Sequence, residues 1–241
     1  MKYYFVSDIH LGLPPEKEAK EREIRFVNWL DSIKHSAAEI FLLGDIFDFW
    51  FEYKTVIPKG FSRTFGKIAE LTDAGIPVHF FAGNHDLWIR NYFSAELGMI
   101  IHNHDYYVEI CEKKFYMVHG DALNPGDKRH MRLRTIFTNR ILYKMYSLIH
   151  PRFGLALGNK WSISNRKKHV ELKFEQDNPF YSIATEKAGK EGIDIFIIGH
   201  IHTPVHLQEN GFEFIALPDW LSGRDGYAAF DNGTIDLYNV E

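Results

Sequence analysis

The sequence predicts an α/β protein with mixed sheets, and three observations lead to this prediction. Short apolar runs bounded by polar or glycine-containing turns recur along the 241 residues, and runs of this length are typical of strands buried on both faces. Helical patterns lie between several of these runs, which indicates an α/β domain. The second half of the chain is rich in strands, so we expect mixed rather than purely parallel sheets.

The elements follow in chain order from these patterns. Predicted strands cover residues 3–6, 40–43, 78–82, 106–110, 115–118, 193–198, 212–217 and 227–230. The clearest helical patterns are 16–35 and 62–74, the second of which ends at Gly75 with Pro77 just beyond. Glycine after the last turn and proline shortly after it are common helix stop signals.

One segment differs from this alternation. Residues 128–150 contain neither Gly nor Pro and mix Arg with large apolar residues, so we predict one long amphipathic helix that ends at His150, before Pro151. Further helical patterns cover 165–175 and 179–189. The chain is therefore expected to be a single domain, 1–241, with a helical insertion at about 124–190 between the strands that end near His119 and His200.

Composition sets limits on function. The single Cys111 allows no internal disulfide, and neither a signal peptide nor a bilayer-spanning apolar stretch is visible, so we expect a cytoplasmic protein. The net charge of −4 argues against general nucleic-acid affinity, and no nucleic-acid partner is expected. Residues 128–173 nevertheless carry +11 and the remainder −15, which predicts that the insertion faces something anionic.

Five short motifs each follow a predicted strand. They are Asp8-Ile9-His10, Gly44-Asp45-Ile46-Phe47-Asp48, Gly83-Asn84-His85-Asp86, His119-Gly120-Asp121 and Gly199-His200-Ile201-His202. The carboxyl ends of strands form the ligand-binding edge of α/β sheets, so we expect these loops to converge.

The residue types of these motifs suit two divalent metal ions. Asp, His and Asn supply oxygen and imidazole nitrogen without thiolate, which favours Mn, Fe or Zn over soft-metal sites. Residues i and i+2 point the same way, so Asp8 with His10, and His200 with His202, can each present two ligands. A carboxylate such as Asp45 can bridge both ions. Paired ions clamp the attacking and leaving oxygens of an in-line displacement, which predicts a phosphoesterase.

Each motif alone also has a structural explanation. Gly-Asp pairs are common in turns, Asn84 would suit a left-handed turn, and His119 would suit a buried core position. All five motifs in order, each after a strand, favour the metal site. We interpret His102-Asn103-His104 as a surface turn, and we give His35, His79, His130, His150, His169 and His206 structural or surface roles.

The five motifs together resemble the calcineurin-like metallophosphoesterase superfamily. The resemblance implies a four-layer α-β-β-α sandwich with two central mixed sheets. It implies that one metal is bound by Asp8, His10, Asp45 and His202, and the other by Asp45, Asn84, His119 and His200. It further implies that His85 contacts the phosphate and protonates the leaving oxygen, while the carboxylates of Asp48 and Asp86 orient the site.

A narrower resemblance, to the UDP-2,3-diacylglucosamine pyrophosphohydrolases of lipid A synthesis, covers almost the whole chain. It rests on Gly-Asp-Ile-Phe-Asp-Phe-Trp (44–50), His-Gly-Asp-Ala-Leu (119–123), Gly-His-Ile-His-Thr-Pro (199–204) and the insertion. It implies water attack at the α-phosphate of UDP-2,3-diacylglucosamine, giving UMP and 2,3-diacylglucosamine 1-phosphate (lipid X). It also implies Mn as the usual metal and a helical lid around the acyl chains.

The sequence departs from the narrower family at one position. Many of its members have Arg after the motif Asn, where this chain has His85. We therefore expect other residues to contact the substrate, namely Arg90, Asp127, Arg129, Arg132, Arg134 and Lys167.

The insertion supplies apolar residues for acyl chains, namely Leu133, Ile136, Phe137, Ile141, Leu142, Met145, Leu148 and Ile149. A basic amphipathic helix also suits a membrane surface, which predicts a peripheral protein on the inner face of the inner membrane. Three alternatives stay open at this stage. In the first, the insertion only packs on the core. In the second, the scaffold serves a different esterase, namely a nuclease, a cyclic-nucleotide phosphodiesterase or a protein phosphatase. In the third, it is a non-catalytic binding protein. The roles of Asp219 and Trp220 also stay open.

Overall fold

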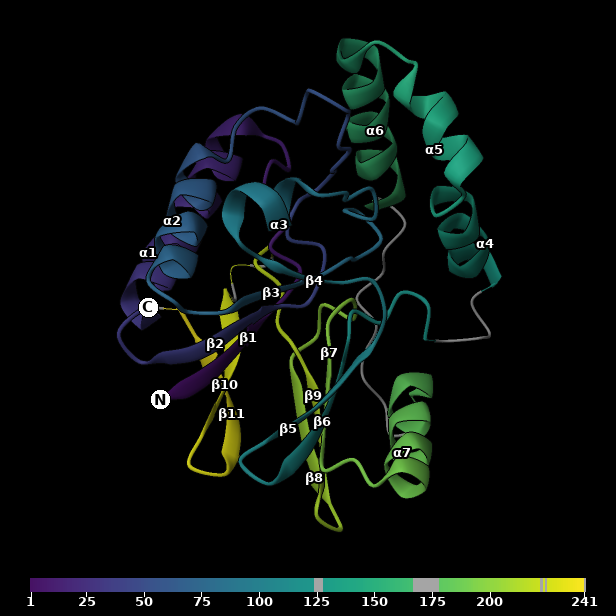
Figure 1. The fold of residues 1–241 in the computed structure, drawn as a ribbon. Coiled ribbons are helices and arrows are strands. Elements are labelled where there is room, and N and C mark those ends of the chain that lie inside the picture. Colours follow the sequence, from purple (N-terminus) through teal and green to yellow (C-terminus); the bar gives the residue numbers. More distant parts are fainter. Residues whose placement is uncertain (124–127, 167–177, 222, 224, 241) are drawn as a thin grey trace.

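Two mixed β-sheets form the centre of the protein in a computed structural model, which describes residues 1–123, 128–166, 178–221, 223 and 225–240 (Figure 1). In spatial order the first sheet comprises β11 (Thr234–Asn239), β10 (Gly226–Asp231), β1 (Lys2–Val6), β2 (Ala37–Leu42), β3 (Val78–Phe81) and β4 (Ile100–His102). The second comprises β5 (Tyr106–Ile110), β6 (Lys113–Val118), β7 (Ile195–Ile198), β9 (Phe212–Ala216) and β8 (Val205–Glu209).

Parallel strands form one side of the first sheet, as far as its edge strand β4, and the middle of the second sheet. The pairs β1–β2, β2–β3 and β3–β4 are parallel in the first sheet, and β6–β7 and β7–β9 are parallel in the second. Antiparallel strands complete the sheets: β10 and β11 beside β1, β5 beside β6, and β8 beside β9. The expectation of mixed sheets is confirmed. The carboxyl ends of the parallel strands share one edge of the molecule, and the predicted motifs follow these ends.

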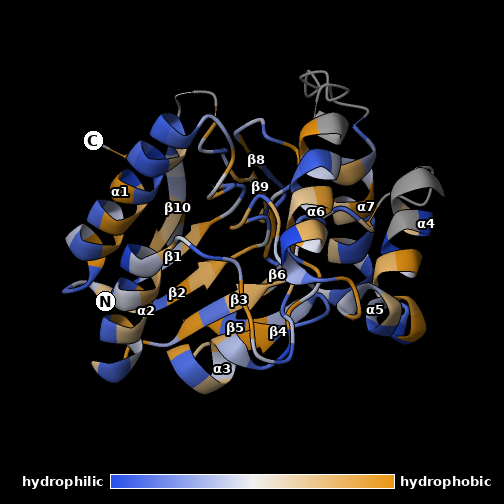
Figure 2. Ribbon diagram, turned by 90° about the horizontal axis from the view of Figure 1, so that it is seen from above, coloured by the Kyte–Doolittle hydropathy of each residue, from blue (hydrophilic) through white to orange (hydrophobic). Residues whose placement is uncertain are grey.

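Helices cover the outer faces of both sheets. The helices α1 (Glu16–Ile33), α2 (Ser62–Asp73) and α3 (Tyr92–Leu97) lie against the first sheet, and α7 (Pro179–Glu191) lies against the second (Figure 1). Figure 2 shows hydrophobic residues along the strands between these helices, while α1 and α2 alternate hydrophilic and hydrophobic residues along their length. The layers are therefore helix, sheet, sheet and helix, which is the sandwich that the resemblance implied.

Successive side chains of β1 pack alternately into the two apolar clusters on either side of the first sheet. Tyr4 and Val6 point into a cluster with Phe26 and Trp29 of α1, while Phe5 points between the sheets and stacks on Phe41. Successive side chains of a strand face opposite sides of the sheet. A strand between two apolar layers therefore has a continuous apolar run in its sequence. Each of these buried side chains contributes about 1.5–3 kcal/mol of transfer free energy.

The outer core of the second sheet involves α7. Phe180 and Ala184 of this helix pack with Phe196 and Phe214 of the sheet. The side chain of Asn178 accepts the backbone N–H of Phe180, which caps the helix, and Gly192 ends it with φ +68°. The helical pattern predicted at 179–189 is thereby confirmed. The sequence analysis placed α7 in the insertion, whereas its contacts make it the fourth layer of the sandwich.

The rest of the insertion differs from the single helix predicted for 128–150. The structure has α4 (Lys128–Phe137), then α5 (Arg140–Ser147), then α6 (Pro151–Arg166). The side chain of Asn139 accepts the N–H groups of Ile141 and Leu142 and so starts a new helix, which breaks the predicted one. Pro151 begins α6, where its missing N–H costs no hydrogen bond. The pattern at 165–175 lies mostly outside the described residues.

Aromatic residues attach the three helices α4–α6 to the sandwich. Phe51 stacks on Tyr143 with ring centroids 5.1 Å apart and contacts Tyr146 at 4.7 Å. The Tyr143 hydroxyl donates to the carbonyl oxygen of Glu52, and the Trp88 indole N–H donates to that of Phe137. The helices α4–α6 therefore lie beside the loops that follow β2 and β3, at the carboxyl edge of the sheets (Figure 1).

Candidate metal centre and adjoining pocket

Seven predicted metal ligands follow five different strands. Asp8 and His10 follow β1, Asp45 follows β2, Asn84 follows β3, His119 follows β6, and His200 and His202 follow β7. The two sheets face each other, so their carboxyl edges bring these loops together although the residues are up to 194 positions apart in the chain. All seven lie in or beside one cluster at that edge.

Five of the seven candidate ligands have a left-handed backbone conformation, which sets the direction of their side chains. Asp8, His10, Asp45, His200 and His202 have φ between 49° and 63°. Such values are uncommon outside glycine and occur preferentially at functional sites, where the surrounding structure enforces them. The backbone of the centre is therefore strained at the positions that the sequence marked as ligands.

Two glycines make room for the ligands. A Cβ at Gly83 would lie 2.2 Å from Oδ1 of Asp45, and one at Gly44, where φ is +85°, would lie 2.6 Å from Nδ1 of His119. Any larger side chain would displace Asp45 or His119. The Gly in each of these two motifs is thus required by close packing around the centre.

The ligand atoms form two groups that share a carboxylate. Donor atoms of Asp8, His10 and His202 lie within 4.8 Å of one another, and so do those of Asp45, His119 and His200. His10 forms a further group of this kind with Asp48 and His85. Oδ2 of Asp45 lies 3.5 Å from Nε2 of His119 and 3.8 Å from Nε2 of His10, so it lies between the groups. Carboxylate and imidazole donors without thiolate fit a pair of divalent ions.

Asn84 and Asp8 lie beside histidines of these two groups. Oδ1 of Asn84 lies 3.4 Å from Nε2 of His119, beside the second group. The carboxylate of Asp8 is fully buried; its Oδ2 accepts the Ser7 hydroxyl at 2.6 Å and the N–H of His200 at 2.9 Å. Its Oδ1 lies 3.2 Å from Nε2 of His202, on the side where a metal ion would lie.

Burial and neighbouring charges shift the pKa values of the carboxylates and histidines in the centre. Burial raises the pKa of Asp45, but His119 and His85 oppose it and hold that pKa well below its usual range. Burial lowers the pKa of His119, but Asp45 outweighs it and raises that pKa to about 10. Burial and the neighbouring His119 lower the pKa of His200 to about 3. Buried carboxylates thus require positive charge nearby, which protons or metal ions can supply.

Backbone and carboxylate groups orient the ligand rings. The carbonyl oxygen of Leu43 lies 2.8 Å from Nδ1 of His119, and Oδ2 of Asp219 lies 3.4 Å from Nδ1 of His202. In both rings Nε2 is therefore the atom that points to the centre. Metal-binding histidines usually donate their other N–H in this way. Sequence reasoning left Asp219 undecided; its contact with His202 assigns it to the centre.

Asp86 connects the loops rather than facing the centre. Its carboxylate accepts backbone N–H groups of Gly83, Asp45, Ile46 and Phe47 at 2.8–3.3 Å. Burial raises its pKa to about 7, together with the charge of Asp45 and against those hydrogen bonds. Its contacts tie the loop after β2 to the loop after β3.

His85 and Asp48 interact with a residue of α6 that the sequence analysis missed. Nδ1 of His85 lies 2.7 Å from the carbonyl oxygen of Asp48, to which it donates. The Ser162 hydroxyl donates to Oδ2 of Asp48 at 2.9 Å and lies 3.1 Å from Nδ1 of His85. Ser162 is fully buried. Nε2 of His85, 3.9 Å from Oδ2 of Asp45, is left to face the centre.

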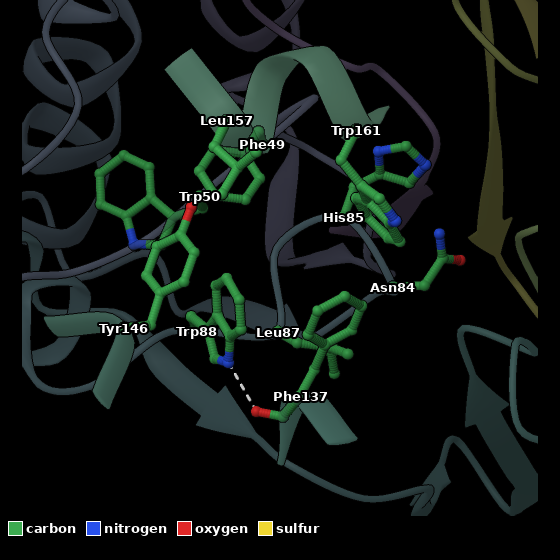
Figure 3. Close-up of a pocket in the computed structure, with 11 residues that line it drawn as sticks. Phe49, Trp50, Asn84, His85, Leu87, Trp88, Phe137, Tyr146, Leu157 and Trp161 are labelled. Carbon is green, nitrogen blue, oxygen red and sulfur yellow. Dashed lines mark hydrogen bonds between the residues drawn. The ribbon is translucent and has the colours of Figure 1, made fainter. Parts of the chain in front are cut away.

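An apolar pocket of about 280 Å³ adjoins the centre through Asn84 and His85 (Figure 3). The loop after β2, the loop after β3 and the helices α4–α6 enclose it. Its other lining residues are Phe49, Trp50, Leu87, Trp88, Phe137, Tyr146, Leu157, Gly158 and Trp161. The pocket is therefore aromatic and aliphatic along its length and polar only where it meets the centre.

The insertion residues predicted to bind acyl chains lie elsewhere, with one exception. Phe137 lines the pocket, but Ile136, Ile141, Leu142, Met145, Leu148 and Ile149 are exposed. On α5, which begins anew after Asn139, Ile141, Leu142 and Met145 face outward, whereas Tyr146 faces the pocket. The side chain of Leu133 lies outside the described residues. Leu157 and Trp161, which do line the pocket, were missed because α6 was not predicted.

The predicted substrate contacts have different surroundings. Arg90 lies over the Tyr143 ring, with its guanidinium carbon 5.4 Å from the ring centroid. Arg132 is exposed on α4, whereas Arg134 forms an ion pair with Asp121 at 2.7 Å, beside His119. Asp127, Lys167 and the side chain of Arg129 lie outside the described residues.

His102 is not part of a surface turn, as the sequence analysis proposed, but ends β4. Its Nε2 lies 2.8 Å from Nδ1 of His79, and its ring stacks on Phe81. Asn103 and His104, which follow, are exposed.

The chain is similar to known proteins in sequence and in fold. Residues 1–204 match the family model described as calcineurin-like phosphoesterase. A protein of Porphyromonas gingivalis named UDP-2,3-diacylglucosamine hydrolase is 35% identical, covering 100% of this chain and 98% of that protein. One of the same name from Haemophilus influenzae is 28% identical, covering 94% and 92%. A solved structure of an archaeal phosphodiesterase shares the fold, with 16% identity, a TM-score of 0.51 and 99% of each chain covered.

Proposed function

The chain belongs to the calcineurin-like phosphoesterase family, and on this premise we propose that it hydrolyses the diphosphate of UDP-2,3-diacylglucosamine to UMP and 2,3-diacylglucosamine 1-phosphate. It is a metal-dependent hydrolase, because the family, the relatives and the donor set agree on that chemistry. The apolar pocket beside His85 is the observation that most directly supports a lipid substrate. A pocket lined almost entirely by apolar groups next to the reaction centre suits an acyl chain better than a small hydrophilic phosphoester.

We propose the ligand sets that the family resemblance implied. Asp8, His10, Asp45 and His202 would hold one divalent ion. Asp45, Asn84, His119 and His200 would hold the other. The geometry supports this division, because the two groups of donors meet at Asp45. Mn is the proposed physiological ion, since oxygen and imidazole donors accommodate it well.

The chain's own residues prepare the reaction. Two bound divalent ions would polarise the diphosphate and lower the pKa of the attacking water. His85 is held through Nδ1 by Asp48 and Ser162, so Nε2 can contact the phosphate and give a proton to the leaving oxygen of the lipid phosphate. The apolar pocket holds an acyl chain and so places the diphosphate at the centre.

We further propose that α4–α6 contact a membrane surface, which would make the protein peripheral at the membrane that holds its substrate. Ile141 is 70% exposed, Met145 60%, Leu148 85% and Phe153 65%. Lys144 and Arg152 lie among them, and basic residues beside exposed apolar ones suit an anionic bilayer. No helix of the described residues is long and apolar enough to cross a bilayer.

The experiment that tests the assignment compares two substrates. With Mn present, we expect rapid release of UMP from UDP-2,3-diacylglucosamine, and slow turnover of bis-p-nitrophenyl phosphate. Excess chelator should abolish both activities, and Mn should restore them. Turnover of the small ester alone would retain the metal chemistry but refute the lipid substrate.

A further inference from the structure

A second cavity, of about 200 Å³, adjoins the metal centre through His119 and Asp121. Unlike the apolar pocket, it is lined by hydrogen-bonding and charged side chains as well as apolar ones. The polar members beyond the centre are His102, Asn103, His104, Asp105, Tyr116 and Arg134. We propose that this cavity binds the nucleoside end of the substrate, and that His102 selects uracil by accepting a hydrogen bond from its imide N–H. This inference rests on the proposed function.

The position of the cavity follows from the shape of the substrate. The diphosphate must lie at the metal centre, with the acylated sugar on one side and the nucleoside on the other. The apolar pocket meets the centre at Asn84 and His85, and the polar cavity meets it at His119. Oδ1 of Asn84 lies 3.4 Å from Nε2 of His119, so the two spaces are separated only by the centre. A base and a ribose match the polar cavity, as acyl chains match the apolar one.

His102 is held in the wall of the cavity by a chain of contacts that the proposed reaction does not use. Its Nε2 lies 2.8 Å from Nδ1 of His79, and Nε2 of His79 lies 3.0 Å from Oε2 of Glu39. The His102 ring also contacts Phe81 and Tyr106, with centroids 4.5 Å and 4.2 Å away. These contacts fix its orientation.

The contacts also decide where the protons lie. Burial and then His102 lower the pKa of His79 to about 4, and burial lowers the pKa of His102 as well, so both rings are neutral at pH 7. Nε2 of His79 lies within ion-pair distance of the Glu39 carboxylate but outside hydrogen-bond geometry. The nearby negative charge favours the tautomer with the proton on Nε2, in which Nδ1 is the acceptor. His102 must then donate from Nε2, and its own Nδ1 is a bare acceptor.

A bare acceptor distinguishes the pyrimidine bases. The N3 atom of uracil carries a hydrogen and donates, whereas N3 of cytosine is itself an acceptor. Sites built to hydrogen-bond one partner reject an analogue that leaves the buried group unpaired. Two other contacts keep the wall in place: the Tyr116 hydroxyl donates to Asp105 at 2.7 Å, and Arg134 pairs with Asp121. The chain thus offers uracil a fixed acceptor in a shaped polar cavity.

The test measures binding of UMP and CMP to the full-length, Mn-loaded protein by calorimetry. We expect UMP to bind more tightly than CMP. His102→Phe, which keeps a ring but no acceptor, should weaken UMP binding about tenfold and remove the preference for UMP. His102→Asn keeps an oxygen acceptor near the position of Nδ1 and should retain part of the preference. His206→Phe is the matched control, since His206 of β8 pairs with Glu213 of β9 and lines neither cavity.

Activity and binding measurements together distinguish a failure of the nucleoside site from a failure of the proposed function. His206→Phe should turn over bis-p-nitrophenyl phosphate and bind UMP as the parent does, because His206 lies outside both cavities. If UDP-2,3-diacylglucosamine is hydrolysed but His102→Phe binds UMP and CMP as the parent does, the nucleoside site is refuted alone. If UMP binding depends on His102 while the lipid substrate is not turned over, the site stands and the lipid assignment fails.

Discussion

At the scale of single residues, the chemistry depends on a few side chains whose positions are fixed by their neighbours. Asp45 lies between the two donor groups, and its backbone is held by Asp86. The seven candidate metal ligands could be selected from the sequence because each belongs to a short motif after a strand. The sequence did not predict Ser162, since a lone Ser in a helical segment carries no signal until the fold brings it to His85.

The first prediction concerns Asp45 and His85. Asp45→Ala should remove both ions and reduce turnover at least about a thousandfold, because a shared ligand of both sites is lost. His85→Ala should lower kcat about a hundredfold with metal content unchanged, because its proposed role is to donate a proton. Metal analysis and kinetics on the same preparations check both results. Loss of metal in His85→Ala would show that His85 is a ligand.

The second prediction concerns Ser162, which we propose positions His85. Ser162→Ala should lower kcat about tenfold while leaving KM and metal content unchanged, because it removes one hydrogen bond to a group that acts in the reaction. Ser162→Thr keeps the hydroxyl and should restore most of the rate. Ser147→Ala, on exposed α5, is the control. Equal losses in the Ala and Thr variants would indicate packing rather than positioning.

At the scale of elements, the insertion lines the apolar pocket beside the candidate metal centre. Its helices turn one set of apolar residues toward His85 and another toward solvent. Sequence periodicity predicted helix throughout 128–150 but not the cap at Asn139, which depends on a local hydrogen bond. The short elements α3, β4, β8 and β11 were also missed, because they are too brief or too polar to show a pattern and form through neighbouring strands.

The third prediction separates the two apolar surfaces of the insertion. Leu157→Lys places a charge in the pocket and should lower kcat/KM for the lipid substrate in detergent about a hundredfold, without changing bis-p-nitrophenyl phosphate turnover. Leu148→Lys should reduce co-sedimentation with anionic vesicles but keep activity in detergent. The same phenotype in both variants would contradict this division.

The fourth prediction concerns acid stability and the contact between β3 and β4. The pKa of His79 is lowered to about 4, so the unfolded chain takes up a proton near pH 6.5 while the folded chain does not. The contribution that neutral His79 makes to the free energy of unfolding is therefore complete above pH 6.5 and is lost as the pH falls toward 4. After allowance for solvent screening, we expect about 1–2 kcal/mol of this loss to disappear in His79→Gln.

Urea unfolding of the metal-free protein between pH 7 and pH 4.5 measures this effect. His35→Gln, at an exposed position, is the control. Parallel pH profiles for the parent and His79→Gln would show that His79 is protonated alike in the folded and unfolded chain.

At the scale of the whole molecule, the two facing sheets bring together residues from both ends of the chain. Arg22 of α1 donates to the carbonyl oxygens of His10 and Trp220, and Trp220 donates through its backbone N–H to that of Asp8. The apolar runs and helical patterns predicted a mixed α/β fold, and the family resemblance implied the four-layer sandwich. The two cavities were not predicted, because each is formed by loops and helices far apart in the sequence.

The most direct test of the central claim is hydrolysis of UDP-2,3-diacylglucosamine in water enriched in oxygen-18, followed by mass spectrometry of both products. Attack at the α-phosphate between the proposed metal sites predicts one labelled oxygen in UMP and none in 2,3-diacylglucosamine 1-phosphate. Label in the lipid phosphate, release of UDP, or no turnover with Mn would contradict the account.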